Sequence, residues 1–300
     1  MKNGFSGLWP AMFTPVDDNG DPAFDQMEKL VELLISQRMD GIYILGSTGM
    51  GVLFTEQQRK KITEAVIKIV NGRLPVIVQV GALTTDESVR LAIHAEKCNV
   101  SGISSVGPIY YGANSEMALK HYYTIAKSTA LPFLPYQLGD NSIPGDTIDF
   151  VKRLIDIPNV AGMKLTTNQL LEISLIHNYS GDKLQLFSGS DELFCHAALC
   201  GTVGAIGSTY NLWGVQCKHV MTEFINGNFQ LAREFMLSYQ DVIQTIMPNI
   251  WTFLRAGMRL KHGIEIGPTK APLANTQKKW NDNDVLAISE KIESIISIAQ

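Results

Sequence analysis

The sequence predicts an α/β protein built as a (β/α)8 (TIM) barrel with a helical extension at its C-terminal end. Short apolar runs alternate with longer amphipathic runs from the N-terminus to about residue 210. Eight apolar runs occur in this stretch, which is the number of strands that a closed parallel barrel requires. A length of 300 residues is also normal for such a barrel.

Each predicted strand is short and mostly apolar, as expected for strands that are buried on both faces. The predicted strands are Gly7–Phe13, Gly41–Leu45, Val76–Val80, Gly102–Val106, Pro132–Pro135, Val160–Lys164, Gln185–Phe187 and Gly204–Ile206. An open, doubly wound sheet is the alternative arrangement of such units. We disfavour it because the chain has no glycine-rich fingerprint for binding phosphate.

The amphipathic runs between the strands predict helices. Four of these helices are Phe24–Gln37, Glu56–Val70, Asp86–Lys97 and Glu116–Thr129. The pairs Thr55–Gln58 and Thr84–Glu87 have the spacing of capping boxes, which satisfy free backbone amides at a helix start. We therefore expect two of the helices to begin at these threonines.

The strand pattern stops after about Val220. The helices predicted beyond it are Met221–Ile225, Phe229–Ile246, Ile250–Lys261 and Asn283–Ile298, with breaks at Met247–Asn249 and Gly263–Pro272. No linker rich in glycine, serine or charge separates them from the barrel. We expect residues 1–300 to form a single domain, with the barrel at about 1–222 and the extension at about 223–300.

Composition argues against several classes of protein. A net charge of −4 without runs of arginine or lysine disfavours a nucleic-acid partner. No stretch approaches about 18 apolar residues and the first residues lack a signal-peptide core, so we expect a cytoplasmic protein without a membrane partner. The four cysteines contain no Cys-x-x-Cys pair, and His196 beside Cys195 has no familiar ligand spacing. We expect reduced, buried thiols and no metal site.

Lys164 is the most informative residue of the chain, because it ends the apolar run Asn159–Lys164. Catalytic groups of parallel barrels lie at the C-terminal ends of strands. Removing a primary amine from water lowers its pKa from about 10.4 towards neutrality, and the neutral amine can attack a ketone. The alternative is a strand-end lysine whose amine extends into solvent.

Small polar residues and tyrosines follow the other predicted strands. Ser47 and Thr48, after the second strand, would form a cradle for a carboxylate, although a plain turn is the alternative. Tyr110 and Tyr136 follow the fourth and fifth strands, where tyrosines can also simply cap the core. The seventh strand leads into Ser188–Glu192, in which Ser190 or Asp191 could cap a helix.

Taken together on one rim, these residues supply a carboxylate cradle, an amine nucleophile, a phenol for proton transfer and acceptors for hydroxyl groups. The combination is typical of an aldolase that works through an imine. A binding protein is a weaker interpretation, since a binder needs neither a neutral amine nor a proton carrier.

On these residues the chain resembles the lysine-dependent pyruvate aldolases, the family of N-acetylneuraminate lyase and dihydrodipicolinate synthase. The matching segments, in order across most of the barrel, are Gly46–Gly49, Tyr136, Gly162–Lys164 and Ser188–Asp191. The segments most similar to the N-acetylneuraminate lyase branch are Lys164–Thr166, Gly189–Glu192 and Gly204–Asn211. The resemblance implies a barrel that reversibly cleaves sialic acid (N-acetylneuraminate) to N-acetylmannosamine and pyruvate, with no cofactor beyond the imine on Lys164.

The resemblance also implies roles for individual residues. The catalytic residues would be Lys164, Tyr136, Ser47 and Tyr110, with Tyr110 reaching into a neighbouring subunit of a homotetramer or dimer. Ser47 and Thr48 would hold the substrate carboxylate, and Tyr136 would relay the proton of the 4-hydroxyl. The residues implied to bind the sugar are Thr166, Gly189, Asp191, Glu192 and Ser208.

Two related activities stay open. Dihydrodipicolinate synthase receives a second carboxylate on an arginine shortly after its catalytic tyrosine, whereas Gln137–Ser142 contains none. Asp191 and Glu192 would repel such a substrate and favour a neutral polyol. Met50 stands where the family usually has glutamate, and the segment after Tyr136 departs from the family's usual wording. A lyase or dehydratase for another 2-keto-3-deoxy sugar acid is therefore the nearest alternative.

Overall fold

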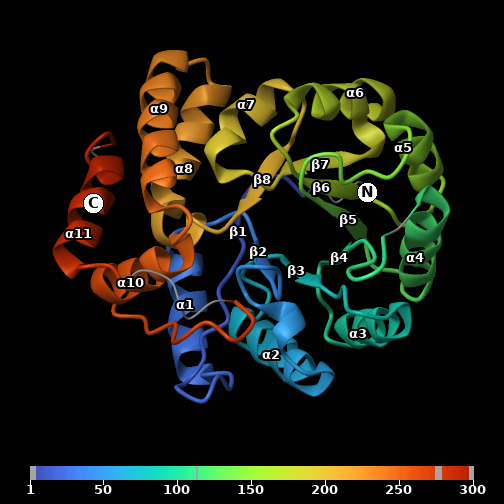
Figure 1. Ribbon diagram of the computed structural model, residues 1–300, viewed down its shortest axis with the longest axis horizontal. Helices are drawn as coiled ribbons and strands as arrows, with labels where there is room; N and C mark the ends of the chain where they lie inside the picture. The colour runs from blue at the N-terminus through green and yellow to red at the C-terminus, as the bar shows by residue number, and fades with distance from the viewer. Residues whose placement is uncertain (1–4, 113, 274–278, 297–300) are drawn as a thin grey trace.

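A computed structural model describes residues 5–112, 114–273 and 279–296, and it confirms the predicted barrel (Figure 1). The parallel strands are β1 (Gly7–Pro10), β2 (Ile42–Ile44), β3 (Val76–Gln79), β4 (Gly102–Val106), β5 (Phe133–Leu138), β6 (Gly162–Thr166), β7 (Gln185–Ser188) and β8 (Gly204–Gly207). They pair in the order β1-β8-β7-β6-β5-β4-β3-β2, and a bridge between Ala11 and Tyr43 joins β1 to β2. The ring of strands is thereby nearly closed.

Helices surround this ring on the outside (Figure 1). The helices of the barrel are α1 (Phe24–Ser36), α2 (Glu56–Val70), α3 (Thr85–Lys97), α4 (Ser115–Lys127), α5 (Thr147–Ile155), α6 (Leu170–Ser180), α7 (Phe194–Leu199) and α8 (Tyr210–Ile225). Thr55 and Gln58 form a complete capping box at the start of α2. At α3 the side chain of Thr84 accepts from the Glu87 amide, which is half of the predicted box.

The extension consists of α9 (Phe229–Ile246), α10 (Ile250–His262) and α11 (Asp282–Glu293), drawn in orange and red beside α8 in Figure 1. Two helix predictions were wrong here. Helix α8 begins at Tyr210 rather than at Met221, because the stretch interpreted as a polar loop continues directly into the helix. Helix α11 ends at Glu293, five residues before the predicted Ile298, which lies outside the described residues.

The alternation of side chains along each strand separates two cores. One face of each strand points at the helices, as Met163 and Leu165 of β6 do. The other face fills the barrel interior with large side chains, among them Trp9, Tyr43 and Phe187. Lys164 lies between Met163 and Leu165 in sequence, so the period of two directs its side chain into the barrel.

The predicted ends of three strands were also wrong. β1 ends at Pro10, three residues before the predicted Phe13. β5 runs to Leu138 and β6 to Thr166, whereas the apolar runs end at Pro135 and Lys164. The pairing between these strands carries them past their apolar segments, because Leu138 and Thr166 are register partners. Tyr136 therefore lies within β5 rather than just after it, and Lys164 lies in the middle of β6 rather than at its end.

In the part of the chain that the structure describes, no helix is long and apolar enough to cross a membrane. The described residues also contain no group of three or more histidine, cysteine or acidic side chains arranged for a metal. The four cysteines are free thiols; Cys195 and Cys217 are buried, but Cys98 and Cys200 are only partly buried, contrary to the expectation for all four.

Candidate active site

Lys164 is enclosed in the barrel beside Tyr136. The Cα atoms of these two residues are register partners in the β5–β6 pair. The Lys164 Nζ atom lies 4.3 Å from the centre of the Tyr136 ring and 4.7 Å from the centre of the Tyr43 ring. Only 5% of Lys164 is exposed. This geometry excludes the alternative of an amine that extends into bulk solvent.

The enclosure changes the protonation of this amine. Burial lowers the pKa of Lys164 from 10.5 to about 8, against the opposing effect of the Asp191 carboxylate. With a pKa of about 8, roughly one amine in ten is neutral at pH 7, compared with about one in 3,000 at 10.5. The site therefore holds a usable fraction of nucleophilic amine at neutral pH.

The Tyr136 phenol is connected to hydroxyl groups of neighbouring elements. Its oxygen lies 3.0 Å from Thr166 Oγ1 on β6, and it also hydrogen-bonds with Ser47. Burial raises the pKa of Tyr136, while the hydrogen bonds with Thr166 and Ser47 act in the opposite direction. The phenol stays protonated at neutral pH, so it can transfer a proton only along its hydrogen bonds.

Asp191 places a second ionisable group close to Lys164. It lies in η3 (Asp191–Leu193), directly after β7, and is 8% exposed. Its Oδ2 atom accepts hydrogen bonds from the Thr209 amide at 2.8 Å and the Thr209 hydroxyl at 2.5 Å. Burial raises the pKa of Asp191 to about 6, and the bonds from Thr209 oppose this shift. At neutral pH the carboxyl is mostly ionised and can accept hydrogen bonds from hydroxyl groups.

Two glycines leave the space that these side chains occupy. A Cβ on Gly189 would lie 2.0 Å from Thr166 Oγ1 and 2.9 Å from Lys164 Cε. A Cβ on Gly207 would lie 2.0 Å from Asp191 Oδ1. Glycine is needed at both places because any larger residue would displace the lysine or the carboxylate.

Ser47, Thr48 and Ser208 bring hydroxyl groups to the same rim. Thr48 Oγ1 and Ser208 Oγ are 2.7 Å apart, although 160 residues separate them in sequence. Thr48 is buried in this contact, whereas Ser47 is exposed and lines the adjacent cavity. Of the two hydroxyls predicted to hold a carboxylate, Ser47 is the one open to a ligand, and Thr48 is already bonded.

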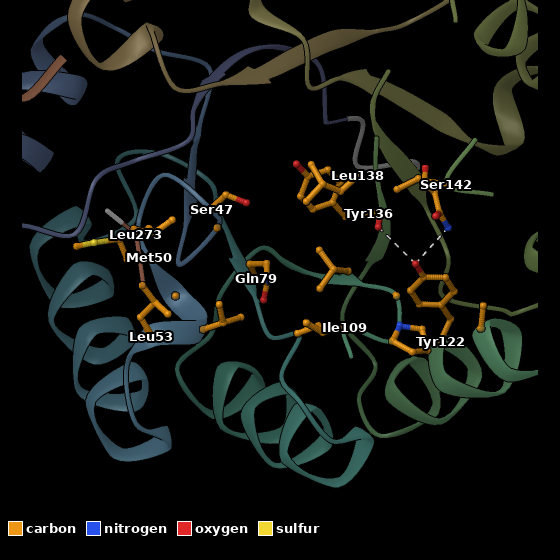
Figure 2. A pocket seen from close by; sticks show the side chains of 18 of the residues that line it. Ser47, Met50, Leu53, Gln79, Ile109, Tyr122, Tyr136, Leu138, Ser142 and Leu273 are labelled. Atoms are coloured by element: carbon orange, nitrogen blue, oxygen red, sulfur yellow. Dashed lines mark hydrogen bonds between the residues drawn. The ribbon is translucent and has the colours of Figure 1, made fainter. Parts of the chain in front are cut away.

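A cavity of about 560 Å³ opens beside Ser47 and Tyr136 (Figure 2). Its polar lining residues are Ser47, Gln79, Tyr122, Tyr136, Gln137 and Ser142. The extension completes one wall with Trp251 and Leu273. Among the described residues that line the cavity, none carries a positive charge. These lining residues therefore offer no cationic partner for the second carboxylate of a dianionic ligand.

Tyr110 does not join the site of its own chain. It is 76% exposed and contacts Tyr111, itself 73% exposed, with ring centres 5.1 Å apart. Glu192 is half-buried at the rim, and its carbonyl oxygen accepts a hydrogen bond from Gln240. Of the predicted residues, Ser47 and Tyr136 line the cavity, whereas Lys164 and Asp191 are not part of its lining. Thr166 bonds Tyr136, Gly189 lies against Thr166 and Lys164, and Thr48 pairs with Ser208.

Sequence reasoning missed two residues at the site. Tyr43 packs against Lys164 and donates a hydrogen bond to Ser104 Oγ, but it reads as an ordinary strand tyrosine. Gln79 lines the cavity while its side-chain oxygen accepts from Arg59 Nη2 at 3.3 Å. A polar residue near the end of an apolar run was the available signal for Gln79.

Comparison with known proteins supports an assignment that the site already suggests. The profile of the Dihydrodipicolinate synthetase family matches residues 4–291. The chain belongs to this family. The N-acetylneuraminate lyase 2 of Escherichia coli O6:H1 is 33% identical to it over 248 residues, with 82% of this chain and 81% of that protein covered. The N-acetylneuraminate lyase of Citrobacter koseri is 28% identical over 93% of this chain and 95% of its own length.

Solved structures agree on the fold. An N-acetylneuraminate lyase from Mycoplasma synoviae superposes with a TM-score of 0.86 at 29% identity, covering 97% of this chain and 98% of that one. The sialic acid aldolase of Ruminococcus gnavus gives a TM-score of 0.90 at 23% identity, over 97% and 98% of the two chains. Class I aldolases of this family form a Schiff base on a lysine and need no metal. The protein is accordingly an enzyme, a carbon–carbon lyase of the class I aldolase type.

Met50 occupies the position at which the resemblance implies a glutamate. It is buried with a left-handed backbone (φ 53°), and its sulfur lies 3.6 Å from Arg255 Nη2 and 3.3 Å from the Lys270 amide nitrogen. Burial lowers the pKa of Arg255 to about 10. The thioether thus stands as a weak acceptor where a carboxylate would neutralise a buried guanidinium.

Proposed function

We propose that the enzyme is a sialic acid lyase, which cleaves N-acetylneuraminate to N-acetylmannosamine and pyruvate, reversibly, through an imine on Lys164. The enclosed amine between two aromatic rings carries this proposal, because its lowered pKa suits attack on a ketone and little else. Residues 1–300 would act as one catalytic domain, since Trp251 and Leu273 of the extension help to line the cavity.

The reaction begins when the neutral Lys164 amine adds to the keto carbon of the open-chain sugar acid. Loss of water gives an imine, whose protonated nitrogen accepts the electron pair as the bond between C3 and C4 breaks. The 4-hydroxyl gives up its proton and becomes the aldehyde of N-acetylmannosamine. The remaining enamine takes a proton at C3, and hydrolysis of the imine releases pyruvate and restores the amine.

Tyr136 would relay the proton from the 4-hydroxyl. Because its own pKa is raised, the phenol passes a proton on through Ser47, Thr166 or the substrate carboxylate instead of acting as a free phenolate. Ser47, with Thr48 behind it, would hold that carboxylate. These groups are close enough to work in concert.

The sugar would extend towards Asp191, with Thr166, Gly189, Glu192 and Ser208 around it. An ionised Asp191 accepts hydrogen bonds from hydroxyl groups but repels a second carboxylate. The absence of a cation among the described cavity residues also disfavours the aldehyde acid used by dihydrodipicolinate synthase. A neutral polyol is the substrate tail that fits both features.

The exposed pair Tyr110–Tyr111 supports an oligomer, either a dimer or a tetramer. Two neighbouring aromatic side chains with this exposure are typical of an interface. We infer that Tyr110 serves the site of a neighbouring subunit. Sedimentation of the wild type and of Tyr110→Ser would test this, and a monomeric wild type would contradict it.

The substrate is tested by pyruvate release from a panel of keto sugar acids. We expect the highest kcat/KM on N-acetylneuraminate and no release from any acid by Lys164→Ala, with Lys120→Ala as a surface control. Condensation of pyruvate with an aldehyde acid is measured in parallel. Full activity on shorter 2-keto-3-deoxy acids and none on N-acetylneuraminate would contradict the proposal.

A further inference from the structure

Helix α9, which lies outside the barrel, is bonded to the segment that carries Asp191 and Glu192. Two consecutive residues of the helix make these bonds. The Tyr239 hydroxyl is hydrogen-bonded with the Thr209 hydroxyl, which in turn bonds Asp191. The Gln240 side-chain amide donates to the Glu192 carbonyl oxygen at 2.9 Å. Helix α9 of the extension is therefore bonded to Asp191 through Thr209 and to the backbone of Glu192 directly.

The donor and acceptor roles along the first of these chains are fixed by counting protons. A threonine hydroxyl has one proton, and Thr209 donates it to Asp191 Oδ2. Thr209 Oγ1 can then only accept from Tyr239, so the phenol is the donor. The order Tyr239 to Thr209 to Asp191 polarises the final bond towards the carboxylate. Without the hydrogen bond donated by the Tyr239 hydroxyl, the bond from Thr209 to the Asp191 carboxylate would be weaker.

The Tyr239 ring has no freedom to move away from this arrangement. It is fully buried, stacks on Phe235 with ring centres 5.2 Å apart, and meets Phe194 and Trp213 edge-on at 6.1 and 6.0 Å. On the other side of the chain, Asp191 Oδ1 lies where a Cβ of residue 207 would be. The carboxylate is thus held between a rigid aromatic cluster and the end of β8.

We infer that Tyr239 and Gln240 are positioning residues that hold Asp191 and Glu192 in the geometry needed to bind the hydroxyl-bearing part of the substrate. The inference rests on the proposed function and extends it, since it assigns part of the substrate selectivity to the extension. Tyr239 is fully buried, and the bonds that Tyr239 and Gln240 make are to Thr209 and to the Glu192 carbonyl oxygen, so we place their effect in the position of the two acids.

Tyr239→Phe tests the phenol, because it keeps the ring and removes one hydroxyl. Tyr210→Phe is the matched control: Tyr210 is also fully buried beside Phe194, and its hydroxyl has no hydrogen-bond partner among the described residues. Gln240→Met provides a second, half-buried variant of nearly equal volume. Thermal unfolding of all variants shows which of them are folded.

Two measurements separate positioning from general damage. Trapping of pyruvate on Lys164 with borohydride reports the amine with a ligand that lacks the hydroxyl-bearing part of the substrate, whereas KM for N-acetylneuraminate depends on that part. We expect Tyr239→Phe and Gln240→Met each to raise KM about tenfold with kcat changed less than about threefold, the effect of one lost hydrogen bond. Pyruvate trapping should stay within about twofold of wild type, and Tyr210→Phe should match wild type in both measurements.

The outcomes distinguish this inference from the proposed function. A wild type that traps no pyruvate refutes the imine mechanism itself. A wild type that traps pyruvate, with both variants at the control's KM, refutes the positioning role alone. A folded Tyr239→Phe variant whose pyruvate trapping falls by the same factor as its KM rises would also refute it. The phenol would then support the barrel as a whole.

Discussion

Replacement of Lys164 by methionine should make the protein more stable while abolishing its activity. Methionine has similar length and flexibility, so it fills the space between Tyr43 and Tyr136 without a charge. Burial of the amine is unfavourable for the folded state, as its lowered pKa shows. Higher stability together with lost activity is expected when a residue is retained for its chemistry and not for its contribution to folding.

The magnitude follows from the change in pKa. A fall from 10.5 to about 8 corresponds to about 3 kcal/mol at roughly 1.4 kcal/mol for each tenfold change in the proton equilibrium. Part of this gain is lost, because Asp191 loses the cation that favours its ionised form. We expect Lys164→Met to raise the free energy of unfolding by about 1 to 3 kcal/mol at pH 7.

The stability that Lys164→Met adds should decrease as pH rises. Below pH 8 the folded and unfolded chains both hold the proton, so the wild type bears the whole penalty of a buried charge. Between pH 8 and 10.5 the folded chain releases the proton first, and the penalty falls as pH rises. The variant's advantage should therefore be full at pH 7 and smaller at about pH 9.5.

Urea unfolding of both proteins at the two pH values measures this, with Lys120→Met on the exposed face of α4 as the control. The control should change stability by less than about 0.5 kcal/mol. A Lys164→Met variant that is less stable than wild type, or whose gain does not vary with pH, would refute an enclosed amine with a lowered pKa.

Three further substitutions have defined outcomes. Tyr136→Phe should reduce kcat for cleavage by about 100-fold or more and leave pyruvate trapping intact, because proton transfer and not imine formation is removed. Gly189→Ala should reduce pyruvate trapping at least about tenfold, since its Cβ would lie 2.0 Å from Thr166 Oγ1. Met50→Glu should raise the thermal midpoint by about 3 °C, because a carboxylate would pair with the buried Arg255 guanidinium.

Each of these has a control and a contrary outcome. Full turnover by Tyr136→Phe would remove its assigned role. Gly112→Ala, where an added Cβ meets nothing within 4 Å, should behave as wild type, and an equal loss at both glycines would argue against a steric cause. Met50→Leu keeps the volume without an acceptor, so a midpoint for Met50→Glu below that of Met50→Leu would contradict the pairing with Arg255.

The number and order of the barrel elements could be predicted because apolar and amphipathic runs differ in period. The ends of β5 and β6 could not, since Leu138 and Thr166 extend their strands through pairing with each other and not through apolar character. The start of α8 was missed for a related reason. Its first turn is buried against the barrel, where Tyr210 meets Phe194 of α7 and Asn211 bonds the backbone of Ala11 and Phe13, although the residues after β8 look like a loop.

The sequence could single out Lys164, Tyr136 and Asp191 as candidates, because each lies at or shortly after the end of an apolar run. It could not point to groups that reach these residues only through tertiary contacts. Tyr239 lies 30 residues from Thr209 along the chain, and no local pattern connects the two hydroxyls. The same holds for Arg255 behind Met50, a contact across 205 residues.

The most direct test of an imine on Lys164 is mass spectrometry after reduction with sodium borohydride in the presence of pyruvate. We predict loss of activity together with one reduced pyruvate adduct per chain, on the peptide that contains Lys164, and none without pyruvate. An unmodified Lys164 after this treatment, or an adduct on another lysine, would contradict the account.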